Sequence, residues 1–169
     1  MTTFRNLLKA TALAGVVTLA AQTIALADVV TCVGGALEQT IVVTQNDPDT
    51  LLDTGGTVVL ANSTINAGPS GGNPDTYIVT LSGEADNTTA GGFFSVQAQI
   101  RVDNGPWNDI NPNSPNTFHQ GPTQTTASMT WCTRVQANAS AAIRILWDSV
   151  GPGNTATLDD YTLMVQRLN

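Results

Sequence analysis

The sequence has 169 residues, of which 41% are hydrophobic and 11% charged, and its formal net charge is −7 at pH 7. A chain of this length has room for one domain with a hydrophobic core of its own. An acidic surface repels phosphate backbones and anionic lipid headgroups, so the composition argues against nucleic-acid partners and against binding to a membrane surface.

Residues 1–27 have the pattern of a cleavable export signal. Arg5 and Lys9 make the start positive, a long apolar run follows, and 25–27 (ALA) matches the small-x-small site that a signal peptidase cuts. The run is too short for stable membrane insertion. We expect a mature chain over 28–169, exported to the periplasm or the extracellular space. It keeps four of the six basic residues against thirteen acidic ones, a net charge of −9.

Alternation of apolar and polar residues predicts strands beyond the signal. The clearest case is 94–102, which reads FSVQAQIRV. In chain order, strands are predicted at 40–44, 57–61, 77–82, 94–102, 127–135, 143–147 and 158–168. Gly, Pro, Asn and Asp predict turns at 45–50, 66–75, 87–92, 103–106, 111–116 and 151–154. About seven to nine short antiparallel strands and no helical period favour an all-β, two-layer antiparallel β-sandwich in a single domain over 28–169.

The order of these segments resembles exported bacterial jelly-roll domains, which are distantly similar to the C1q and tumour-necrosis-factor-like group. The segments that carry the resemblance are 77–85 (YIVTLSGEA), the turn 102–105 (VDNG), Trp131-Cys132 and 157–163 (TLDDYTL). The resemblance implies a jelly-roll-like sandwich that binds or assembles, often as a trimer. It carries over no catalytic residue.

The mature chain has two cysteines, Cys32 and Cys132. In an exported chain an even number of cysteines predicts a disulfide, and two cysteines allow one connectivity. A bridge that closes a loop of about 100 residues contributes roughly 4–5 kcal/mol through chain entropy. The alternative is two separate buried thiols.

The segment 51–55 (LLDTG) resembles the Asp-Thr-Gly signature of aspartic proteases, especially the small retroviral type. In those enzymes two aspartates share one proton and activate a water, so a chain with one motif has to dimerise. Gly56 stands where Ala or Ser usually follows the motif. Asp53 is therefore a candidate catalytic residue in one interpretation and part of a polar turn in the other.

Two acidic clusters are candidates for a structural calcium site, because Ca²⁺ takes six to eight oxygen ligands. One cluster is Asp47, Asp49 and Asp53, and the other is the pair Asp159 and Asp160. Neither has the spacing of an EF-hand loop, and the alternative is that these carboxylates are solvated in turns. Apart from this calcium, we expect no cofactor.

Three ring side chains in loop segments are candidates for ligand contact: Trp107, Phe118 and His119. Trp131 and Trp147 share the phase of aliphatic neighbours, which predicts that they belong to the core. His119 is the single histidine and no Gly-x-Ser-x-Gly elbow precedes it, so a catalytic triad is not expected.

These patterns favour an exported, non-enzymatic β-sandwich with a binding or structural role toward an extracellular or cell-surface partner. Two alternatives remain open. One is a small dimeric aspartic protease centred on Asp53. The other is a subunit of a surface fibre, in which a sandwich lends an edge strand to its neighbour. A homo-oligomer is compatible with each of these functions.

Overall fold

The computed structural model describes Cys32 and residues 35–53, 55–69 and 71–169. The signal peptide predicted at 1–27 lies outside the described residues. The described residues form eleven strands and no helix. This part of the chain therefore has no helix with the length and apolar character needed to cross a membrane.

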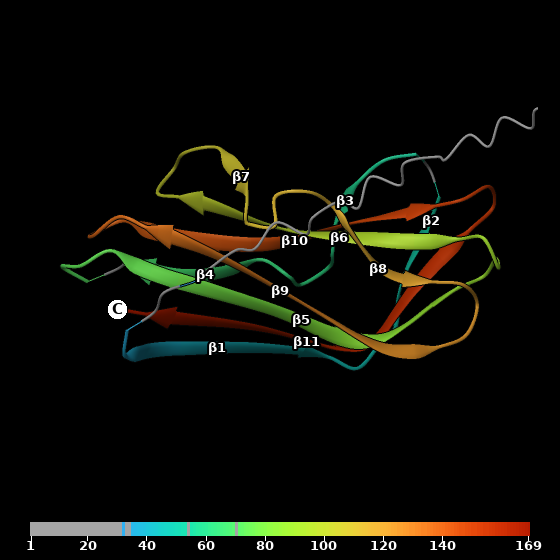
Figure 1. Cartoon of the computed structure of the whole chain (residues 1–169), viewed down its shortest axis with the longest axis horizontal. Coiled ribbons are helices and arrows are strands. Elements are labelled where there is room, and N and C mark those ends of the chain that lie inside the picture. The colour runs from blue at the N-terminus through green and yellow to red at the C-terminus, as the bar shows by residue number, and fades with distance from the viewer. Residues whose placement is uncertain (1–31, 33–34, 54, 70) are drawn as a thin grey trace, which may run out of the picture.

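The first sheet has five strands, in the order β1-β11-β5-β9, with β2 also paired to β11. Every pairing in it is antiparallel. The strands are β1 (Leu37–Gln45), β2 (Asp49–Leu52), β5 (Asp75–Asn87), β9 (Thr125–Val135) and β11 (Thr155–Leu168). The C-terminus lies beside the start of β1 (Figure 1).

The second sheet has six strands, in the order β3-β10-β6-β7, with β4 also paired to β10 and β8 to β6. Its pairings are likewise antiparallel. The strands are β3 (Val58–Val59), β4 (Ile65–Pro69), β6 (Phe93–Val102), β7 (Trp107–Asp109), β8 (Asn116–Gln120) and β10 (Ser140–Val150). The two sheets form two layers (Figure 1), which confirms the predicted all-β sandwich.

The core lies between the sheets because each long strand points alternate side chains inward. Trp131 and Trp147 are 1% and 4% exposed, as predicted from their phase. Trp147 meets Phe94 edge-on, with ring centroids 6.0 Å apart. The largest fully buried side chains come from both layers: Trp131, Tyr77, Tyr161, Phe94, Leu60, Leu81, Ile110, Ile143, Ile145, Leu158, Leu163 and Val79.

Four short strands raise the number above the predicted seven to nine. β2 and β4 overlap segments predicted as turns, and β7 and β8 lie where no strand was predicted. Each of the four pairs with a long strand, either β11, β10 or β6. Their sequences contain Asn, Asp and Pro, which do not favour strands. Their extended conformation therefore comes from hydrogen bonds to the partner strand.

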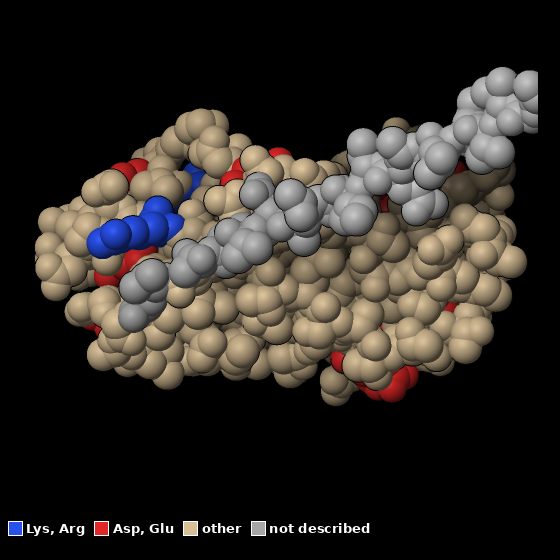
Figure 2. Space-filling view, viewed as in Figure 1, with Lys and Arg blue, Asp and Glu red and all other residues tan. Residues whose placement is uncertain are grey.

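Charged groups are sparse on the surface, in keeping with the composition. Figure 2 shows basic atoms gathered at one end of the face in view and acidic atoms in small scattered groups. Such a face offers no extended charged patch to a partner.

Candidate functional site

A groove on the outer face of the second sheet is the candidate site, and its volume is about 210 Å³. Its floor is made by neighbouring side chains of β6 and β10, because Ser95 pairs with Asp148 and Gln97 pairs with Leu146. The residues that line it are Thr57, Ser95, Val96, Gln97, Gln99, Asp109, Pro115, Leu146, Trp147 and Asp148. We call this feature the outer groove.

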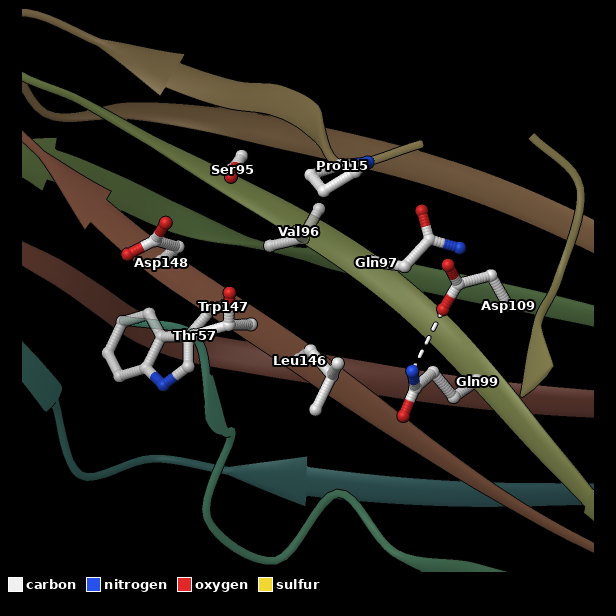
Figure 3. A pocket seen from close by; sticks show the side chains of 10 residues that line it. All are labelled: Thr57, Ser95, Val96, Gln97, Gln99, Asp109, Pro115, Leu146, Trp147 and Asp148. Atoms are coloured by element: carbon white, nitrogen blue, oxygen red, sulfur yellow. Dashed lines mark hydrogen bonds between the residues drawn. The ribbon is translucent and has the colours of Figure 1, made fainter. Parts of the chain in front are cut away.

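The outer groove is bounded by segments from both sides of the β6–β10 pair. Asp109 at the end of β7 and the following loop with Pro115 line one side, and Thr57, just before β3, lines the other. Figure 3 shows Asp148 near one end and Asp109 with Gln99 near the other, with Leu146 between them. Its two carboxylates are thus separated along the groove.

Gln97 is the most unusual residue of the outer groove, since it is polar, faces outward and is only 3% exposed. Its Nε2 donates to the carbonyl oxygens of Ala98 at 2.8 Å, Ile110 at 2.9 Å and Pro112 at 3.2 Å. Because the amide nitrogen donates and the amide oxygen only accepts, the three surrounding carbonyls identify this end of the side chain as Nε2. The carbonyl oxygen Oε1 is buried and has no hydrogen-bond partner among the described residues.

Gln99 is held in place by an acid on one side and a base on the other. Its Nε2 donates to Asp109 Oδ1 at 2.8 Å, and its Oε1 accepts from Nε and Nη2 of Arg144 at 3.0 and 2.8 Å. The Arg144 guanidinium lies 4.2 Å from the centroid of the Trp107 ring, and that of Arg101 lies 5.0 Å from it. These cation–π and hydrogen-bond contacts make a connected, preorganised end of the groove.

The opposite end carries a carboxylate in an unfavourable setting. Burial, and then the negative charge of Asp53, raise the pKa of Asp148 above its usual value of 3.8. Both effects disfavour the ionised form. A hydrogen-bond donor brought next to Asp148 would therefore stabilise its carboxylate.

Of the three ring side chains predicted for ligand contact, only Trp107 lies at the surface and near the outer groove. Phe118 is 8% exposed and packs on Phe94 with centroids 5.4 Å apart. His119 is also 8% exposed, with Nε2 3.1 Å from the Gly121 carbonyl oxygen and Nδ1 3.1 Å from the Thr125 hydroxyl. The structure thus gives Phe118 and His119 packing and hydrogen-bonding roles inside the sandwich.

Asp53 fastens the end of β2 to the turn between β10 and β11. Its two carboxylate oxygens accept from the backbone N–H groups of Gly55 and Gly151, both at 3.1 Å. Its own N–H donates to the Asn154 carbonyl oxygen at 2.9 Å. These contacts match the polar-turn interpretation of the LLDTG segment.

The acidic residues considered for calcium are spread along two neighbouring strands. Asp47 lies between β1 and β2, and Asp49 pairs with Leu158 on β11. Asp159 Oδ1 accepts from the backbone N–H of Asp160 at a β-bulge. Across the part of the chain that the structure describes, no group of three His, Cys, Asp or Glu side chains is arranged to hold a metal ion.

Cys32 and Cys132 form the predicted disulfide, with Cα atoms 6.2 Å apart and a sequence separation of 100. The bond ties the segment before β1 to β9. A disulfide of this kind is typical of proteins that work in an oxidising compartment outside the cytoplasm.

The groove residues were not singled out by the sequence. Ser95, Gln97 and Gln99 are the polar positions of the clearest predicted strand, and alternation assigns them to solvent. A signal was present in their type, because uncharged amides in place of Lys or Glu are suited to burial with hydrogen bonds. The burial itself comes from the loop that contains Ile110 and Pro112, which follows the strand in sequence.

Comparisons with known proteins report distant structural similarity only. No protein-family model and no curated protein matches the sequence. Similar solved structures include one of infectious bursal disease virus, Gx strain, with TM-score 0.41 and 11% identity over 79% of this chain and 38% of that chain. The family two carbohydrate esterase from Cellvibrio japonicus has TM-score 0.29 and 17% identity over 78% of this chain and 35% of that chain.

The C-terminal domain of EclA, described as a sugar-binding protein, has TM-score 0.32 and 14% identity over 79% of this chain and 82% of that chain. The chain spans well under half the length of the viral and esterase chains. At these identities the similarity concerns the β-sandwich fold alone. The fold and the outer groove thus define this protein as a two-layer antiparallel β-sandwich with a polar groove on one sheet.

Proposed function

We propose that the protein is an exported, non-enzymatic module that binds a partner at or beyond the cell surface through the outer groove. The observation that carries the proposal is Gln97, a residue of the groove lining whose carbonyl oxygen is buried and has no hydrogen-bond partner among the described residues. Burying a carbonyl in this way costs about 1–3 kcal/mol. Because Gln97 Oε1 is closed to solvent, a ligand recovers that cost by donating to it only when a shift of the side chain brings the oxygen to the groove surface.

The rest of the groove supports binding by a rigid surface. Its floor belongs to two central strands, and Gln99 is already held by Asp109 and Arg144. Side chains held in advance lose little freedom when a ligand arrives. The volume is below the roughly 300–1,000 Å³ of pockets that enclose whole cofactors, so it suits one unit of a larger, mostly exposed ligand.

A non-enzymatic role is supported by how the candidate catalytic groups are used. Both oxygens of Asp53 accept backbone N–H groups, and both ring nitrogens of His119 have partners. General acid–base catalysis needs such a group within hydrogen-bond reach of a substrate. Export is supported by the pattern of residues 1–27 and by the disulfide.

Cell fractionation of the full chain tests the export half of the proposal. We expect the protein outside the cytoplasm with Asp28 as its first residue, measured by N-terminal sequencing. A protein that stays in the cytoplasm with residues 1–27 attached would contradict it.

Arrays of oligosaccharides and of peptides test the binding half. Leu146→Arg places a long charged side chain on the groove floor, and we expect it to abolish the binding shown by the wild type. Met164→Arg is the matched control, because Met164 is also apolar, half-buried and outward-facing, but on β11 of the other sheet. Wild-type binding that survives Leu146→Arg would refute the outer groove as the site.

A further inference from the structure

We infer that the ligand of the outer groove is a carbohydrate, one neutral sugar ring of which lies on the groove floor. This inference rests on the proposed binding function and adds the chemical class of the ligand. It follows from the combination of hydrogen-bond acceptors along the groove with an apolar strip on its floor.

The polar groups that line the groove are mainly acceptors. They comprise the carboxylates of Asp109 and Asp148 and the hydroxyl groups of Thr57 and Ser95, together with Gln97 Oε1, which a ligand reaches only when the side chain shifts. A ligand therefore has to donate hydrogen bonds. Sugar hydroxyls do so, and each can donate to one of these oxygens while accepting from a neighbouring hydroxyl.

An apolar strip accompanies these acceptors. Leu146 lies at the centre of the groove, and Val59, its partner across the β3–β10 pair, is 42% exposed. Pro115 adds an apolar edge on the other side. A sugar ring presents C–H groups on its faces and hydroxyls around its rim, so it can contact the strip and the acceptors at the same time. The volume of about 210 Å³ suits a single ring rather than an enclosed oligomer.

A basic peptide is the competing ligand, because a cation would also be attracted to carboxylates. Two contacts disfavour it at the Asp109 end of the groove. Asp109 already accepts from Gln99, and the positive charge of Arg144 lies on the far side of the same amide. A cation entering this end would approach a guanidinium of like charge, whereas a neutral hydroxyl would not.

Binding of the full-length, exported protein to two arrays tests the inference. One array carries neutral and acidic oligosaccharides, and the other carries Lys- and Arg-rich peptides. We expect binding to neutral oligosaccharides, with affinity lowered about tenfold or more by Gln97→Met, which removes the buried acceptor. Asp148→Asn, which keeps the shape and removes one acceptor, is expected to weaken binding in the same direction.

Matched controls and the remaining outcomes separate the two proposals. Gln124→Met and Asp160→Asn make the same changes at exposed positions away from the groove and should leave binding unchanged. Thermal unfolding shows whether Gln97→Met loses binding because it misfolds. If it does, the binding of Asp148→Asn tests the carbohydrate inference in its place. Groove-dependent binding to basic peptides alone overturns the carbohydrate inference and leaves the binding function standing. Binding to neither array overturns both.

Discussion

Replacing Tyr161 with phenylalanine tests how the first sheet holds the β3–β4 edge of the second. Tyr161 is fully buried, and its hydroxyl donates to the carbonyl oxygen of Ala61. Burial, and then the negative charge of Asp49, raise the pKa of Tyr161 from 10.0 to about 12. Because the folded state holds this proton more tightly, its contribution to stability is complete below pH 10 and is lost as the pH rises toward 12.

The size of the effect follows from the two pKa values. A rise from 10.0 to about 12 corresponds to about 3 kcal/mol of stability, within a total of about 5–15 kcal/mol for a domain. Tyr161→Phe leaves the Ala61 carbonyl without its donor, which costs about 1–2 kcal/mol at neutral pH. The variant should therefore be less stable than the wild type at neutral pH and more stable near the upper end of the alkaline range.

The composition leaves few other groups that titrate at alkaline pH. The chain has two tyrosines, Tyr77 and Tyr161, and its single lysine, Lys9, belongs to the predicted signal. Both cysteines are in the disulfide. In 28–169 the two phenols are thus the side chains that can lose a proton as the pH rises through the alkaline range, since arginine stays protonated.

Urea unfolding at a series of alkaline pH values, followed by tryptophan fluorescence, gives the free energy of unfolding of each variant. Ultraviolet absorbance of phenolate gives the protonation state of the folded protein. Tyr77→Phe is the control, because it removes the other phenol and should retain the alkaline loss due to Tyr161. Parallel pH profiles for the wild type and Tyr161→Phe would refute the reasoning, as would a folded-state Tyr161 that titrates at its ordinary pKa.

Three further changes test other parts of the structure. Replacing Cys32 and Cys132 with serine should lower the free energy of unfolding by roughly 4–5 kcal/mol, measured in urea; a loss under about 1 kcal/mol would count against the entropic account. Asn154→Ala removes the amide that joins the loops at one end of the sandwich, with partners that include Asn87. We expect this change to lower the free energy of unfolding by about 2–4 kcal/mol in urea. An unchanged urea midpoint would contradict it. Asp53→Asn should lower the free energy of unfolding in urea by about 1–2 kcal/mol. We expect neither the wild type nor this variant to cleave casein at acidic pH above background. Cleavage by the wild type that is lost in the variant would support the protease alternative.

The long strands could be predicted because their pattern is local. Positions 77–82 and 94–102 alternate in sequence, and both lie within central strands, β5 and β6, that bury one face. The short strands could not, since β7 and β8 have few apolar residues and are extended through pairing with β6. Each of these short segments is extended only because it pairs with another strand. That strand is either distant in sequence or is reached when the chain turns back through a loop.

The residues of the candidate site also divide into those that the sequence could predict and those that it could not. Trp107 could be identified as a surface aromatic from the turn before it, and that turn forms as predicted, with the Gly105 N–H donating to the Val102 carbonyl at 3.0 Å. Gln97 could not be identified, because its alternation phase places it on the solvent side of β6. Phe118 and His119 lie in a segment of polar, turn-forming residues, yet their rings reach the interior.

The sequence by itself determined the all-β class, the phase of the long strands, the core positions of Trp131 and Trp147, and the pairing of Cys32 with Cys132. These depend on side-chain periodicity and on the number of cysteines, which are properties of the chain read in order. Only the tertiary structure decided that an outward-facing Gln97 is buried and that it lines a groove. The physical reason is that periodicity states which side of a strand a residue faces, whereas its exposure depends on which distant segment crosses that side.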